Sequence, residues 1–157
     1  MIMLLLEIFD APYKLFRRVD MGIPSIYEFT TSDNRKGRIV FNLVSYKTDT
    51  WHLDFEVEFT TRTGHKVLTY LPTGEGDEYK IMATVMEAIK QFVEEVKPNE
   101  VFFSSLKSSR DSNSRASLYS SMIKKFASSL GYVLRSKHDT KDETKYVLKK
   151  ADDTNAN

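Results

Sequence analysis

The chain has 157 residues, of which 41% are apolar and 29% charged, and its formal net charge is +1. This composition predicts one folded domain over residues 1–150 and disfavours strong overall attraction to nucleic acid or acidic membranes. Cysteine is absent, which excludes disulfides, thiolate nucleophiles and cysteine-bound zinc. No apolar run reaches the roughly 20 residues of a membrane span, so we expect no membrane partner. Residues 151–157 are small and polar and are expected to form a flexible tail.

Charge is unevenly distributed along the chain. Residues 101–150 contain eleven basic and four acidic side chains, a local balance of +7, so the remainder carries −6. Such asymmetry permits a basic face without requiring an anionic partner. Weak binding of nucleic acid by the carboxyl-terminal part therefore stays open as one function.

The first half of the chain predicts mostly β-structure. Apolar and polar residues alternate most clearly over Leu53–Phe59, which is typical of a half-buried strand. Similar patterns predict further strands at Ile26–Thr30, Arg38–Val44 and His65–Leu71. The short connection Thr60–Gly64 predicts an antiparallel hairpin between the strands that flank it.

The second half predicts two amphipathic helices. Apolar residues recur at spacings of three and four within Tyr79–Val96, with Asp77 as the predicted N-cap, and Pro98 ends this helix. A second apolar stripe runs from Leu118 to Leu130. Gly131 stands directly after it, where a left-handed C-terminal cap belongs.

Short apolar segments around these helices predict the remaining strands. Val101–Phe103 is typical of a buried central strand, and Ser104–Ser114 predicts a polar loop. Tyr132–Leu134 and Lys145–Leu148 predict a closing hairpin. The order of elements predicts an α/β (α+β) fold, with a mixed, mostly antiparallel central sheet and two main helices packed on it. The unit Val67–Phe103 is expected to form a parallel strand–helix–strand crossover.

Several short motifs between Thr73 and Val133 resemble a known family. They are Thr73-Gly74-Glu75-Gly76, Ala83-Thr84-Val85, Phe103-Ser104-Ser105, Ser114-Arg115, Leu118-Tyr119 and Gly131-Tyr132. Together they resemble phage-encoded proteins with the GNAT acetyltransferase fold, over about sixty residues. The resemblance implies a GNAT-like fold, and a glycine-containing turn whose amides hold the pyrophosphate of acetyl-CoA. It also implies a protein of the host cytoplasm or of the virion.

The resemblance also supplies candidate site residues. Gly74, Gly76, Asp77 and Arg115 are the candidates for holding acetyl-CoA, because glycines and free helix-start amides let the backbone approach a phosphate. Tyr119 is the candidate catalytic residue, a general acid that protonates the departing thiolate. Each has a structural alternative: the turn is a helix start with acidic caps, Arg115 pairs with Asp111, and Tyr119 is a surface residue.

Other candidates for chemistry are weaker. Glu56 and Glu58 stand where the family sometimes places a general base, but alternation puts them with Asp54 on one face, which favours a solvated acidic face. The histidines have no ligand spacing, so we expect no metal site; they are His52, His65 and His138.

Three functions follow from these observations. The preferred one is a non-catalytic GNAT-fold protein that binds a host or virion protein, because acids crowd the predicted turn and no base is evident. The alternative is an acyl-CoA-dependent N-acetyltransferase with acetyl-CoA at Gly74–Gly76 and Tyr119 as general acid. The third is the weak binding of nucleic acid described above. Whether the protein is an enzyme stays open.

Overall fold

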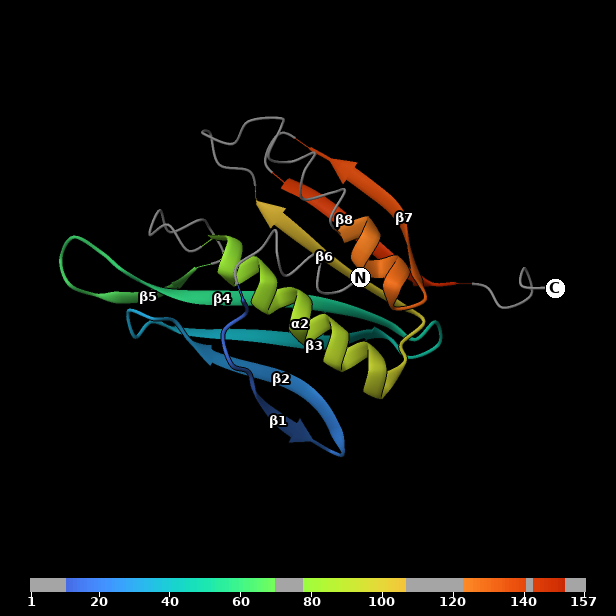
Figure 1. Ribbon diagram of the computed structural model, residues 1–157, viewed down its shortest axis with the longest axis horizontal. Coiled ribbons are helices and arrows are strands. Elements are labelled where there is room, and N and C mark those ends of the chain that lie inside the picture. The colour runs from blue at the N-terminus through green and yellow to red at the C-terminus, as the bar shows by residue number, and fades with distance from the viewer. Residues whose placement is uncertain (1–10, 70–77, 107–122, 141–142, 152–157) are drawn as a thin grey trace.

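One sheet organises the molecule. The computed structural model describes residues 11–69, 78–106, 123–140 and 143–151, and Figure 1 shows a twisted sheet with helices lying across one face. The strands are β1 (Phe16–Asp20), β2 (Ile23–Thr30), β3 (Lys36–Ser45), β4 (Thr50–Thr60), β5 (Lys66–Thr69), β6 (Glu100–Leu106), β7 (Tyr132–Asp139) and β8 (Glu143–Lys150). Their order is β1-β2-β3-β4-β6-β8-β7, and β5 pairs with β4 beside this path.

Neighbouring strands are antiparallel except for one pair. The start of β4 pairs in parallel with the start of β6, so that Trp51 lies opposite Val101. The end of β4 pairs instead with β5, through Val57 opposite Thr69. The predicted mixed, mostly antiparallel sheet with two helices is therefore confirmed.

The predicted parallel crossover within Val67–Phe103 is wrong. Because β5 is antiparallel to β4 and β6 is parallel to it, β5 and β6 run in opposite directions. The chain reverses at the β4–β5 turn, where Gly64 adopts a φ of 85° that side-chain-bearing residues rarely adopt. The parallel connection therefore joins β4 to β6, with β5 inserted before the helix.

The predicted helices are present. α2 spans Glu78–Val96, and its apolar stripe is buried against the sheet. Lys97 follows with a φ of 53°, the left-handed conformation that often ends a helix, and Pro98 cannot continue it. Residues 123–129 are helical, and Gly131 ends that helix with a φ of 79°, which confirms the predicted cap.

A single hydrophobic core lies between the sheet and both helices. It contains Tyr27 and Phe41 from the sheet, Phe92 from α2 and Phe126 from the second helix. The opposite side of the sheet, here called the outer face, is not covered by any described helix (Figure 1). By strand alternation and pairing, the outer face carries Glu28, Arg38, Val40, Asn42, His52, Asp54, Glu56, Glu58, Phe102, Val133, Arg135, Lys145, Val147 and Lys149.

Some boundaries differ from the predictions. β1 was not predicted, because Arg17 and Arg18 interrupt its apolar residues and its register shifts between Arg18 and Val19. β6 continues to Leu106, so the predicted loop does not begin at Ser104. The polar residues of β6 are accommodated because they pair with β8, Ser104 lying opposite Lys145.

Candidate functional site

The sequence-predicted site residues lie outside the described residues. This holds for Gly74, Gly76, Asp77, Arg115 and Tyr119. Their assignments stay predictions, and the candidate site is built from the described elements around them.

The sheet splits between β4 and β6. Their parallel pairing covers three rows and ends at His52 opposite Phe102. Beyond this point β6 continues to pair with β8. On the β6 side of β4, the next paired residue is Val57, whose partner lies in β5. Residues 53–56 of β4 therefore pair with no described strand on their β6 side. Strand edges of this kind offer backbone donors and acceptors to a ligand.

The amino end of α2 lies at the same end of the sheet as this split. The carboxyl end of α2 leads directly into β6, where the Glu100 amide donates to the Asp49 carbonyl at 3.2 Å. Near that end, Phe92 packs edge-on against Trp51 with ring centroids 5.1 Å apart. α2 therefore runs back along β4 and begins where β4 and β6 have diverged (Figure 1). Its first amides have no partner within the helix, which gives that end a positive potential.

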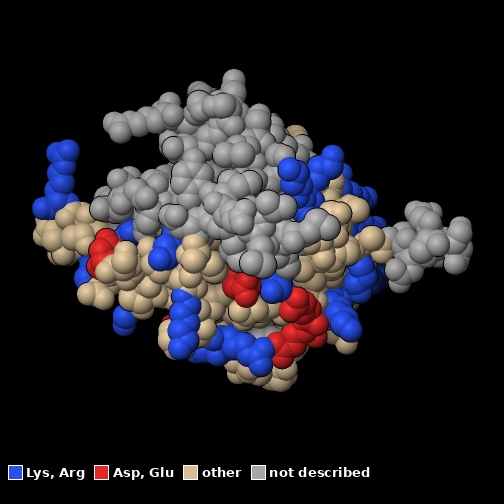
Figure 2. All heavy atoms as spheres, viewed as in Figure 1, with Lys and Arg blue, Asp and Glu red and all other residues tan. Residues whose placement is uncertain are grey.

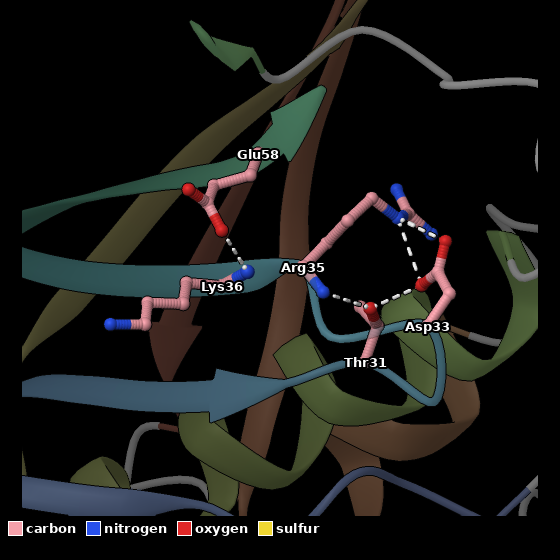
Figure 3. A network of polar contacts seen from close by, with 5 residues as sticks. All are labelled: Thr31, Asp33, Arg35, Lys36 and Glu58. Carbon is pink, nitrogen blue, oxygen red and sulfur yellow. Dashed lines mark hydrogen bonds and ion pairs between the residues drawn. The ribbon is translucent and has the colours of Figure 1, made fainter. Parts of the chain in front are cut away.

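The acidic residues of β4 are held by β3. A carboxylate oxygen of Glu56 accepts a hydrogen bond from Arg38 at 2.8 Å, and Glu58 accepts one from the Lys36 amide at 2.6 Å (Figure 3). Asp54 is exposed on the same face. The prediction that these acids share one face of the strand is confirmed, and their contacts favour a structural role over that of a general base.

A polar network fixes the turn between β2 and β3. The Arg35 amide donates to the Thr31 hydroxyl at 2.9 Å, and the Arg35 side chain forms an ion pair with Asp33 at 2.9 Å (Figure 3). The hydroxyl hydrogen bond from Thr31, followed by the contacts with Arg35, lowers the pKa of Asp33. A carboxylate kept ionised in this way stabilises the turn and is a poor proton acceptor.

A shallow hollow of about 360 Å³ lies beside the carboxyl end of α2. It is lined by Arg17, Gln91, Glu94 and Glu95, and an ion pair joins Arg17 to Glu95. Figure 2 shows acidic side chains beside basic ones on this side of the molecule, toward the β1 edge. The two carboxylates and one guanidinium can form hydrogen bonds with a small polar group. Their charges largely cancel, so the hollow attracts a charged ligand only weakly.

The Tyr27 side chain lies in the same region as this hollow. It is fully buried, and its hydroxyl has no hydrogen-bond partner among the described residues. Burial is the main cause that raises the pKa of Tyr27 to about 12, and Glu95 contributes to the shift. Tyr27 was not among the sequence-based candidates, because a strand residue at a buried alternation position gives no sign that its hydroxyl is unpaired.

Two kinds of feature are absent from the described residues. They contain no group of three His, Cys, Asp or Glu side chains that could hold a metal ion. None of their helices is long and apolar enough to cross a membrane.

Comparison with known proteins identifies the family. Residues 16–144 match the model of a family described as "Family of unknown function (DUF6934)". The chain belongs to this family. No curated protein matches this DUF6934 chain. One solved structure that it resembles is ribosomal-protein-S5-alanine acetyltransferase from Vibrio fischeri, with 13% identity and a TM-score of 0.40, over 91% of this chain and 80% of that one. Neither the phage origin nor the host or virion partner is tested by these comparisons, and both stay predictions.

Proposed function

We propose that this chain binds coenzyme A or an acyl-CoA where β4 and β6 diverge, as the GNAT resemblance implies. The observation that carries the proposal is the coincidence of two features at one end of the sheet. These are the edge of residues 53–56, which no described strand pairs on its β6 side, and the amino end of α2.

The chemistry of the ligand suits both features. Coenzyme A has an extended arm with two amide groups, which can pair with a strand edge as a further strand does. It also carries a pyrophosphate, which the free amides of a helix start attract. A ligand laid between β4 and β6 with its phosphates toward α2 meets the two features together.

Acyl transfer is a separate step from binding. Two described acids of β4, Glu56 and Glu58, are bonded to β3 and face the outer side of the sheet. This favours binding without transfer. Replacing Tyr119 by Phe tests the alternative: an acetyltransferase that uses Tyr119 as general acid loses turnover while it keeps its affinity for acetyl-CoA.

Calorimetric titration of the whole chain with acetyl-CoA, and separately with coenzyme A, tests the proposal. We expect micromolar binding of both ligands, and its loss in Gly76→Glu, which adds a carboxylate to the predicted turn. Ser128→Glu adds the same charge at an exposed position of the second helix and should bind normally. Absence of heat, together with no thermal stabilisation at millimolar ligand, would refute the proposal.

A further inference from the structure

We infer that the hollow beside the carboxyl end of α2 binds a small zwitterion, an α-amino acid. The ammonium group of the ligand pairs with Glu94, and its carboxylate accepts hydrogen bonds from Arg17 and from the buried Tyr27 hydroxyl. The inference is independent of coenzyme A binding, because this hollow lies at the opposite end of α2 from the proposed coenzyme A site.

The Tyr27 side chain projects toward the hollow from the sheet. Tyr27 stands directly opposite Arg17 in the pairing of β1 with β2, so the two side chains leave the same face of the sheet. That face is the helix side, because Arg17 forms its ion pair with Glu95 of α2. After burial, the charges of Glu95 and Arg17 are the further influences on the pKa of Tyr27, so its hydroxyl lies close to this ion pair.

The Tyr27 hydroxyl is enclosed and has no hydrogen-bond partner in the part of the chain that the structure describes. An unpaired polar group in such a place costs stability, and a phenylalanine ring would fill the core equally well. Buried polar groups without partners are rare in native proteins. A hydroxyl with a proton to donate at this position therefore points to an acceptor that arrives through the hollow.

The walls of the hollow offer charges of both signs. Glu94 is exposed and has no ion-pair partner within the described ranges. Gln91 donates its side-chain amide to a neighbouring carboxylate at 3.2 Å, which leaves its side-chain oxygen as an acceptor. The acceptors of Glu94 and Gln91 suit an ammonium group. The donors of Arg17 and Tyr27 suit a carboxylate.

The ligand reaches the Tyr27 hydroxyl when the ion pair between Arg17 and Glu95 opens. Both side chains of the pair are nearly half exposed, at 48% and 41%, and exposed ion pairs contribute little stability. Arg17 can therefore exchange the Glu95 carboxylate for that of the ligand at small cost. A ligand with a single charge leaves either Glu94 or Arg17 unmatched, whereas a zwitterion matches both. The volume of about 360 Å³ accommodates a small amino acid.

Amide NMR spectra of the full chain, titrated with L-alanine in the absence of acetyl-CoA, test the inference. We expect saturable shifts in the millimolar range at Arg17, at Tyr27 and at the carboxyl end of α2. N-acetyl-L-alanine lacks the ammonium group and L-alaninamide lacks the carboxylate, so each should bind about tenfold more weakly. Because acetyl-CoA takes no part in this titration, failure here is distinct from failure of the proposed coenzyme A binding.

Two substitutions in the hollow should weaken the binding of L-alanine. Glu94→Gln removes the charge that pairs with the ammonium group, and the affinity should fall about tenfold. Tyr27→Phe removes the buried donor, and the affinity should fall about threefold or more. Asp54→Asn is the matched control for Glu94→Gln, since it also removes one exposed carboxylate but lies on the outer face, and it should bind normally.

Circular dichroism shows whether each variant is folded. Absence of saturable shifts around the hollow would overturn the inference. Equal affinity for L-alanine and its two analogues would overturn it as well, because the two charges of the ligand would then not be recognised. A folded Tyr27→Phe or Glu94→Gln variant that binds L-alanine as tightly as the wild type would also contradict it.

Discussion

Phe41 of β3 and Phe92 of α2 stack face to face, with ring centroids 4.0 Å apart and planes 4° from parallel. Both side chains are almost fully buried, and Trp51 packs edge-on against the same Phe92 ring. This contact fixes α2 over β3 and β4, and thereby sets where α2 begins relative to the split between β4 and β6. The position of the candidate site thus depends on a contact near the other end of the helix.

Replacing Phe92 by Ala should destabilise the fold by about 3–5 kcal/mol, because it removes a buried ring and leaves a cavity. Urea unfolding followed by circular dichroism measures the change. Phe16→Ala is the matched control, since that ring is 58% exposed, and its effect should stay within about 0.5 kcal/mol. Equal effects of the two substitutions would show that Phe92 does not hold the core.

Gly37 leaves room for the ring of Phe29. A Cβ atom at this position of β3 would overlap the Phe29 side chain on the neighbouring strand. Gly37→Ala should therefore cost about 1–3 kcal/mol. In a Phe29→Leu background the same substitution should cost less, because the ring is gone. A double-mutant cycle measured by urea unfolding gives this coupling, and strictly additive effects would contradict the account.

Two buried tyrosines should respond differently to loss of the hydroxyl. Tyr132 donates a hydrogen bond to the Pro98 carbonyl, so Tyr132→Phe should cost about 0.5–1.5 kcal/mol. The Tyr27 hydroxyl has no partner in the described part of the chain, so Tyr27→Phe should be neutral or stabilise the fold by about 1 kcal/mol. Unfolding free energies at pH 7 decide this, and similar losses in both variants would contradict the assigned hydroxyl contacts.

The same tyrosines predict weaker stability at alkaline pH. Burial is the main cause that raises the pKa of Tyr27 and of Tyr132 to about 12, from an ordinary 10.0. The folded state therefore holds these protons more tightly than the unfolded state. The stability that the raised pKa values of Tyr27 and Tyr132 contribute is fully present below pH 10 and is lost as the pH rises toward 12. Thermal melts across this range should show less alkaline loss in Tyr27→Phe, and an unchanged profile would count against the shift.

Acid should act on the β2–β3 turn. Because the Thr31 hydroxyl and then Arg35 lower the pKa of Asp33, its contribution to stability is present above the ordinary value of 3.8 and is lost as the pH falls below it. Asp33→Asn should remove this part of the acid dependence, as measured by thermal melts between pH 5 and pH 2. A variant with the wild-type acid profile would show that the turn network contributes nothing.

Local pattern was sufficient for much of the fold. Alternation over Leu53–Phe59 predicted the middle of β4, and the apolar stripe before Pro98 predicted α2, because each signal lies within one element. β1 escaped prediction because its place depends on pairing with β2 and its apolar residues are interrupted by Arg17 and Arg18.

The candidate site was less accessible to sequence reasoning. The contact of His52 with Phe102, and the split that follows it, depend on which strand β4 meets, and partners fifty residues apart leave no local pattern. The resemblance placed the ligand near the turn before α2, and the described elements put the split sheet at that same end. The roles of Tyr119 and Arg115 stay predictions.

Amide hydrogen exchange of the whole chain, with and without acetyl-CoA, tests the proposed binding site most directly. The account predicts that saturating acetyl-CoA slows exchange in residues 53–56 of β4 and in the first turn of α2, while the β1–β2 edge is unchanged. Equal exchange of β4 with and without ligand, or protection confined to another part of the sheet, would contradict it.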